Sequence, residues 1–259
     1  MAVAAPSPTP MVGARIPRAG ALDDQGVVRR ENVHALRWRL HGAGKVVGAV
    51  DVGVARLDGT VSIGGAVSAD SLTARGWLEV HATVDVHDLL RTDGTFRAAG
   101  AVHAGEAVVR GTTRLSAPLS VDGTLDARGT LEVPSLRATK LLVHGAVALP
   151  GTAEAPSIVL ELPRDSRIGG LRGRSVSVRG KVPNVVEKVL QHTRHVAVDR
   201  IEADVVRLEA VDVEFVRSPA LVLGRDCHVT TVEGTVARCH PSSAVGPRSQ
   251  SPPPYGLRR

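Results

Sequence analysis

The sequence predicts a β-solenoid, in which the chain winds into stacked triangular coils of about 17 residues. Three observations support this fold class. Glycine recurs at a nearly constant interval, apolar and polar residues alternate between the glycines, and aromatic residues are scarce. Only five of the 259 residues are aromatic, namely Trp38, Trp77, Phe96, Phe215 and Tyr255. The apolar share of 43% is mostly Val, Ala and Leu, and Val favours a pleated strand over a helix.

The glycine series defines the coil. Its steps are 17, 17, 18, 17, 18 and 16 residues, and its members are Gly42, Gly59, Gly76, Gly94, Gly111, Gly129 and Gly145. Between these glycines the apolar residues fall at every second position, which indicates strands with one face inward. Glycine marks the corners, where the chain needs positive φ or close packing. Three such segments make one coil, and coils stack in parallel at about 4.8 Å. We expect the interior to be too narrow for aromatic rings.

Five segments follow from the distribution of this pattern. Residues 1–25 form a disordered N-terminal tail, residues 26–182 the first part of the solenoid, and residues 183–195 a short helical or irregular interruption. Residues 196–240 form the second part, and residues 241–259 a disordered, Pro-rich basic tail. The helix is expected because Val185, Val186, Val189 and Leu190 make one apolar stripe after Pro183. The solenoid has room for about twelve coils, a rod of roughly 60 Å.

Composition argues against several classes of function. The chain has no apolar run of about 18 residues, which a transmembrane helix needs. Its N-terminus lacks the basic start and apolar stretch of a secretory signal. With two cysteines, Cys227 and Cys239, a reduced cytosolic setting is the simpler interpretation. The net charge of +6 comes from 28 Arg and 4 Lys that are interspersed with acids, and aromatics for base stacking are scarce, so nucleic-acid binding is not expected.

The histidines and acids are interpreted as surface decoration of the coils. His41 and His144 each precede a repeat glycine, so they should occupy equivalent corners. His192 and His195 have a spacing that can ligate a metal, but no third ligand is evident. Single acids lie on outward positions beside Arg, where pairing across coils is the ordinary explanation; they are Asp58, Glu79, Asp93, Asp122 and Glu132. A glycosidase or lyase would need clustered carboxylates instead.

No cofactor or metal is expected. Cys227 and Cys239 are twelve residues apart and belong to no CxxC pair, so they are interpreted as buried small hydrophobes rather than zinc ligands. Neither GxxxxGK[ST] nor a helix-opening GxGxxG occurs, so nothing supports nucleotide binding.

The second half of the repeat region contains the pattern Ile201–Glu209 and the turn Leu223–Val229, which leads into Val232 and Glu233. On these motifs and over the whole repeat region, the sequence resembles the bactofilins, a family of bacterial polymer-forming cytoskeletal proteins, and in particular its longer, divergent members. The resemblance implies a right-handed parallel β-helix that polymerises end to end without nucleotide. It further implies a non-enzymatic scaffold for membrane or cell-wall machinery on the cytoplasmic side.

Self-assembly also has a physical basis, because a solenoid exposes an unpaired strand edge at each end. Monomeric solenoids usually carry caps, yet no cap follows Val236, and residues 35–40 have the pattern of a strand. The candidates for core or polymer contacts are Val205, Leu208, Phe215, Val222, Val229 and Val232. Asp in place of Val205, Leu208 or Phe215 is predicted to disrupt the core or the terminal contacts. The partner is thus a second copy, and the tails are candidates for contact with a membrane surface or cell-envelope proteins.

Two other classes of function stay open. Left-handed β-helices of similar coil length occur in hexapeptide-type acyltransferases, which use a histidine as general base. A monomeric binding module could instead use its flat sheet faces. A polymer should form ordered fibres without nucleotide, an acyltransferase should be a trimer that binds coenzyme A, and a binding module should do neither.

Overall fold

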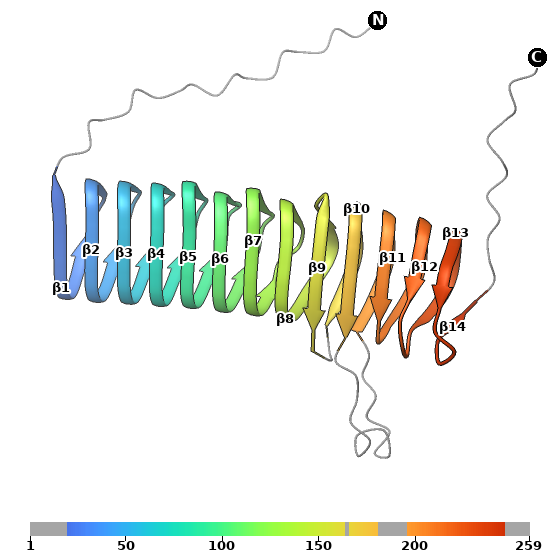
Figure 1. Ribbon diagram of the computed structural model, residues 1–259. Coiled ribbons are helices and arrows are strands. Elements are labelled where there is room, and N and C mark those ends of the chain that lie inside the picture. Colours follow the sequence, from blue (N-terminus) through green and yellow to red (C-terminus); the bar gives the residue numbers. More distant parts are fainter. Residues whose placement is uncertain (1–19, 164–165, 181–195, 247–259) are drawn as a thin grey trace, which may run out of the picture.

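The computed structural model describes residues 20–163, 166–180 and 196–246, and every regular element among them is a β-strand. Figure 1 shows the strands stacked into an elongated rod, with β1 at one end and β14 at the other. They form one 14-stranded sheet in which neighbours along the chain pair in parallel, and β10 also pairs with β8. The strands are β1 (Ala21–Arg30), β2 (Val33–Val46), β3 (Val50–Ile63), β4 (Val67–Val80), β5 (Val84–Ala98), β6 (Val102–Leu115), β7 (Leu119–Glu132), β8 (Leu136–Glu154), β9 (Ser157–Leu162), β10 (Arg167–Gly180), β11 (Val196–Glu209), β12 (Val211–Leu223), β13 (His228–Cys239) and β14 (Ala244–Val245).

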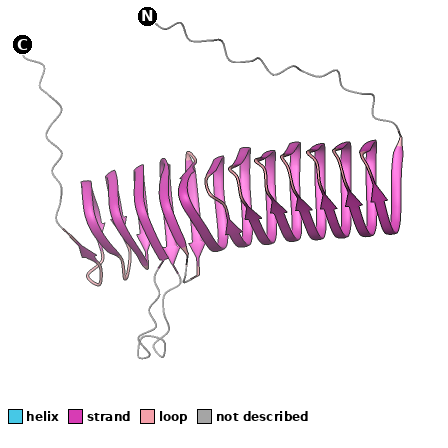
Figure 2. Cartoon of the chain, turned by 180° about the vertical axis from the view of Figure 1, so that it is seen from behind, coloured by secondary structure: helices cyan, strands magenta, loops and turns pink. Residues whose placement is uncertain are grey.

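A single strand bends around most of one rung, as Figure 2 shows. In β3 the alternation of buried and exposed residues slips at Gly53 and again at Gly59, and these two slips mark corners. We call Val50–Val52 the first face, Val54–Asp58 the second and Thr60–Ile63 the third, and we use these names for the equivalent residues of every rung. The three faces make the triangular coil that the sequence predicts.

The register confirms a coil of about 17 residues. Val33 pairs with Val50, and Val50 pairs with Val67, each 17 residues further along the chain. We call the corner between the first and second faces the first corner. Some rungs have one more residue there, so the register shifts between Val86 and Leu89 without loss of pairing on either side. The described strands complete about twelve turns, as expected from the sequence.

The repeat glycines form a column at the corner between the second and third faces. At Gly111, φ is +106°, and a Cβ there would lie 2.2 Å from the carbonyl oxygen of Gly94 in the rung below. Gly145 repeats this geometry over Gly129 with φ of +147°. An L side chain rarely adopts such a φ, and the stacked backbones leave no space for one. The glycine step in the sequence is therefore the step of the rungs.

The interior consists of columns of Val, Leu, Ile and Ala that run along the rod. The expectation that rings would not fit inside is wrong, because Trp38 and Phe96 are 0% and 1% exposed. Trp38 stacks directly on Ala55 of the next rung, and Phe96 stacks on Thr113. A small residue in the adjacent rung supplies the volume that the ring needs, in keeping with close packing of protein interiors. The interior thus tolerates a ring where its column neighbour is small.

The solenoid is longer than the sequence pattern indicated. It begins at Ala21 rather than at residue 26, because Leu22 and Asp24 already alternate inward in register with β2. It extends beyond residue 240, because Ala244 and Val245 pair with β13. The sequence pattern does not reveal these end strands, because β1 is mostly polar and β14 has only two residues.

The sheet is continuous across the segment 181–195. Residues of β10 pair with residues of β11 that lie 30 positions further along, from Arg167 with Ala197 to Arg179 with Glu209. The rungs on either side therefore stack directly on each other. The predicted helix at 183–195 lies outside the described residues.

Candidate functional site

Three of the six contact candidates have side chains that point into the core, and the other three have side chains on the outer surface. Leu208, Val229 and Val232 belong to the core, with exposed fractions of 2%, 0% and 1%. Val205 is 37% exposed and Val222 is partly exposed, so both lie on the outer surface of interior rungs. The sequence does not show which residues of this strand face inward, because Val205 and Val206 are adjacent and either one could be the inward residue.

Phe215 is also on the outside. Its ring lies beneath two guanidinium groups, with the Cζ of Arg200 at 4.8 Å and that of Arg217 at 5.8 Å from the ring centroid. Such cation–π contacts stabilise an aromatic ring at the surface, because the guanidinium groups cover an apolar ring face that would otherwise be exposed to water. Val205 and Phe215 are therefore not core residues, whereas Leu208 is, and the effect of Asp at these three positions stays a prediction.

The N-terminal end of the core is closed by an ion pair. Asp24 points inward in the first rung and is 8% exposed. Arg30 donates from Nη2 to Oδ1 at 2.6 Å and from Nε to Oδ2 at 2.9 Å, and Trp38 Nε1 donates to Oδ2 at 3.0 Å. The hydrogen bond from Arg30 lowers the pKa of Asp24, against the effect of burial. The sequence analysis does not predict this polar cap. The only sign of it in the sequence is an acid two residues after Leu22, at an inward position.

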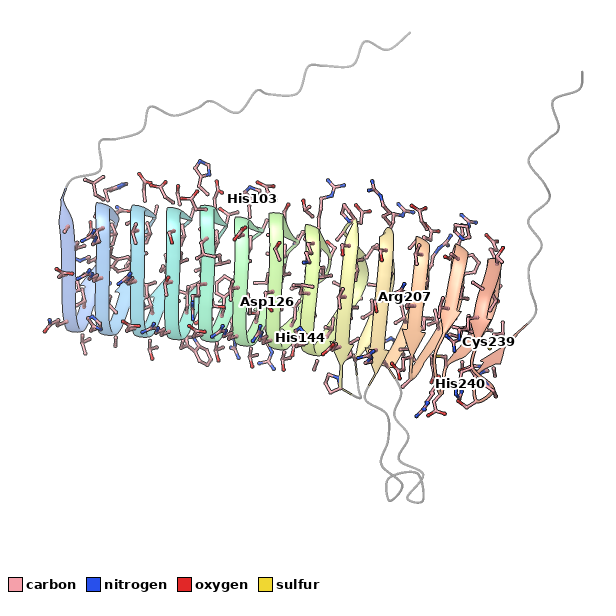
Figure 3. The ribbon with its side chains drawn as sticks, in the orientation of Figure 1. His103, Asp126, His144, Arg207, Cys239 and His240 are labelled. Carbon is pink, nitrogen blue, oxygen red and sulfur yellow. The ribbon has the colours of Figure 1, made fainter. Side chains whose placement is uncertain are left out.

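The C-terminal end is more open. Val229 and Val232 in β13 are buried, whereas Val236 is partly exposed and Cys239 is exposed. Within the described chain, β14 covers only His228 and Val229, so the outer edge of β13 from residue 230 to 239 has no strand partner. Figure 3 labels Cys239 and His240 at this end of the rod. An unpaired backbone edge above apolar side chains is a template for another strand.

The two cysteines differ in environment. Cys227 is buried, and burial raises the pKa of its thiol, as expected for a small core residue. Cys239 occupies the column of Leu223 but is exposed, because no further rung lies on it in the described structure.

Four of the described histidines pair with acids of the next rung, namely His34, His41, His103 and His144. His41 Nδ1 lies 3.4 Å from Asp58 Oδ2, and His144 Nδ1 lies 3.0 Å from Glu161 Oε2. The register places His41 and His144 in one column, which confirms that they occupy equivalent corners. This column runs through the pairings of Asp58, Arg75, Asp93, Arg110 and Arg128. Figure 3 shows His144 at the lower edge of the rod and His103 at the upper edge.

Of the other outward acids, two pair across rungs in the same way and one pairs within its own strand. Asp122 pairs with His103 at 3.4 Å, and Glu132 accepts from Arg114 Nε at 2.8 Å, both across neighbouring rungs. Asp93 accepts from Arg91 Nε at 3.1 Å within its own strand. These three acids therefore form surface pairs, each of which contributes at most about 1 kcal/mol.

A charge ladder that the sequence analysis did not find runs along the first face of the C-terminal half. Arg and Glu alternate from rung to rung in the order Arg137, Glu154, Arg172, Glu202, Arg217 and Glu233. Glu202 is at its centre and accepts from Arg172 Nη2 at 2.9 Å and from Arg200 Nε at 2.8 Å. These hydrogen bonds, that of Arg172 first, lower the pKa of Glu202. The 30-residue step between Arg172 and Glu202 hides the ladder in the sequence.

The first corner also carries a shallow groove of about 520 Å³ between β7 and β10, at one end of this ladder. Its lining includes Asp122, Thr139 and Arg174 beside the paired Arg137 and Glu154. Among the described residues, no group of three His, Cys, Asp or Glu side chains could hold a metal ion. His192 and His195 lie outside the described residues.

Comparison with protein-family models, with curated proteins and with solved structures gave no match. In the described ranges, no helix has the length and apolar character needed to span a membrane. The geometry of the rod itself, with its two unlike ends and its charged faces, is therefore the basis for a functional proposal.

Proposed function

We propose that the protein is a structural, self-assembling scaffold whose rods stack end to end into filaments without nucleotide. The observation that carries this proposal is the open edge of β13, where Val236 and Cys239 continue interior columns that nothing in the described chain covers. Solenoids extend by adding rungs, and a second copy of the same chain supplies a rung of matching cross-section.

The two ends have the same column structure. Leu22 of β1 and Val236 of β13 belong to one interior column, and Asp23 and Arg238 belong to one outer column. If a second copy stacks in the same orientation, its β1 lies over residues 235–239 on the second face. Its residues 27–30 then lie over Ala244 and Val245 on the third face. The joint continues the parallel ladder on two faces.

The charges at the ends are compatible with this head-to-tail joint. Asp23 of the second copy lies over Arg238, which is an opposite-charge pair of the kind seen elsewhere along the rod. Asp24 becomes more deeply buried, but it keeps Arg30 and Trp38 of its own chain as partners. A buried pair with both partners present avoids the large cost of an isolated charge.

The test is sedimentation velocity and negative-stain microscopy of Val236→Arg and of the matched control Val205→Arg. Val236 is in the last rung, so an arginine there reaches water in the monomer but blocks stacking. Val205 is on the outside of an interior rung, so the same substitution should leave filaments intact. Filaments of the wild type and of V205R, and monomers of V236R, are the expected result.

Other outcomes contradict the proposal. A wild-type protein that stays a monodisperse monomer at high concentration would favour the binding module. A discrete trimer that binds coenzyme A would favour the acyltransferase. Filaments of V236R equal to those of the wild type would show that β13 is not the joint. Binding of the tails to membrane or cell-envelope partners, and a cytoplasmic location, remain predictions of the sequence.

A further inference from the structure

The N-terminal half of the rod carries opposite charges on two adjacent faces. On the second face of β2 to β4, four arginines accompany one acid; the arginines are Arg37, Arg39, Arg56 and Arg75. The single acid, Asp58, is paired with His41 at 3.4 Å. None of the four arginines has an ion pair within the described structure, and Arg37, Arg56 and Arg75 are exposed. We call these four residues the basic patch.

The first face and its corner show the opposite charge. From β2 to β7 they carry no Lys or Arg, and they carry five acids, namely Asp51, Asp70, Asp85, Asp88 and Asp122. Asp85 and Asp88 in β5 are exposed, and Asp122 is 71% exposed although it contacts His103. We call these five residues the acidic stripe. Figure 3 shows the second face toward the viewer, with Asp126 near its middle, and His103 of the first face at the upper edge.

We infer that the protein also associates side by side, with the basic patch of one rod against the acidic stripe of a second copy. Both surfaces are flat sheet faces on a rigid scaffold, and they differ in sign. Both lie in the N-terminal half, so parallel rods bring them together while overlapping over their full length. Arginine suits the role because its planar guanidinium forms paired hydrogen bonds with a carboxylate.

The strength of this contact depends on repetition. A single exposed ion pair contributes at most about 1 kcal/mol, so two isolated rods associate weakly. In a filament the same patch recurs once per rod, and the contacts add as a multivalent set. This lateral contact is separate from the end-to-end joint, because it uses side chains of interior rungs instead of strand edges.

Salt and charge reversal test the inference. At about 0.01 M salt the Debye length is about 30 Å, and at about 1 M it is about 3 Å, so side-by-side association should be present at low salt and absent at high salt. Arg37→Glu with Arg56→Glu should raise the dissociation constant about tenfold or more at low salt, because like charges then face each other. Adding Asp85→Arg and Asp88→Arg to the same chain should restore association with the signs exchanged.

Arg174→Glu with Arg207→Glu is the matched control, because it changes the net charge equally in the C-terminal half. It should associate like the wild type. The measurements are bundle width in negative stain and, in the V236R background, salt-dependent dimerisation by sedimentation velocity. Failure of end-to-end assembly would leave the second measurement valid. Wild-type association by R37E/R56E, or no recovery in the fourfold variant with an unchanged circular dichroism spectrum, would overturn the inference.

Discussion

Gly111→Ala should be among the most damaging of conservative substitutions in this chain. Gly111 has φ of +106°, and its missing Cβ would lie 2.2 Å from the carbonyl oxygen of Gly94. Real Cβ atoms essentially never come closer than 3.0 Å, and here the obstacle is backbone instead of a flexible side chain. The rungs must therefore separate locally, or the corner must change its conformation.

Two costs combine at this corner. A non-glycine residue in a sparsely populated φ region costs about 1–3 kcal/mol, and +106° is beyond the left-handed helical well, so about 3 kcal/mol applies. Separation of the rungs stretches one or two ladder hydrogen bonds, each of which contributes about 1 kcal/mol. The expected loss is about 4–5 kcal/mol, a large share of the 5–15 kcal/mol that typically stabilises a domain.

Gly26 and Gly123 separate the two costs. Gly26 is in the same column with φ of +80°, but a Cβ there meets nothing within 4 Å, so Gly26→Ala should cost only the backbone term of about 1–2 kcal/mol. Gly123 does not have a positive φ, and its Cβ would meet Gly105 oxygen at 3.0 Å and the side chain of Glu106 at 3.3 Å, so Gly123→Ala should cost about 1 kcal/mol or less.

Guanidinium chloride denaturation of the V236R background, followed by far-ultraviolet circular dichroism, measures all three variants without a contribution from assembly. If the slope is about 5 kcal/mol per M, the midpoint of Gly111→Ala should fall by roughly 1 M. A midpoint for Gly111→Ala no lower than that of Gly26→Ala would refute the steric part of the reasoning.

Three further predictions concern the cap, the ladder and the core. Because the pKa of Asp24 is lowered by folding, its contribution is present above the ordinary aspartate value of about 3.9 and is lost as pH falls through the folded value. Asp24→Asn should thus be destabilised near pH 7, by about 1–3 kcal/mol, and lose less stability than the wild type between about pH 5 and 2 in urea titrations. Glu202→Gln, in the exposed ladder, should cost about 1 kcal/mol or less in thermal melts, and high salt should shrink that difference. Leu208→Asp should prevent folding or cost more than about 4 kcal/mol, as judged by soluble yield, while Val205→Asp stays within about 1 kcal/mol of the wild type.

The rung architecture was predictable because one physical constraint repeats at a fixed step. The column from Gly42 to Gly145 leaves no room for a side chain, so the sequence shows a glycine at this corner in every rung from β2 to β8. The alternation between the glycines then follows from strands with one buried face. The prediction of the rungs is accurate up to Gly145, where the glycines recur every 16 to 18 residues, and less accurate beyond it, where the step between paired residues lengthens to 30.

Features that depend on contacts between rungs were harder to predict. Trp38 is tolerated inside because Ala55 lies next to it, and that neighbour is known only once the register is fixed. Asp24 is an inward residue because it pairs with Arg30, which an alternation pattern cannot distinguish from an outward acid. The alternation does not show that Val205 faces outward, because another valine, Val206, follows it directly. For Trp38 and Asp24 the missing information is which side chain lies next to the residue inside the rod, and for Val205 it is which side of the strand faces inward.

The 30-residue step between β10 and β11 shows where a rod of this kind can gain extra residues during evolution. A rung before this step and a rung after it remain hydrogen-bonded along Arg167–Arg179. Lengthening a connection between fixed ends costs free energy only as the logarithm of its length. A corner of the coil is therefore a place where extra residues, up to a whole domain, can be inserted while the rungs keep their spacing. The same property offers protein engineers a row of attachment points at intervals of about 4.8 Å.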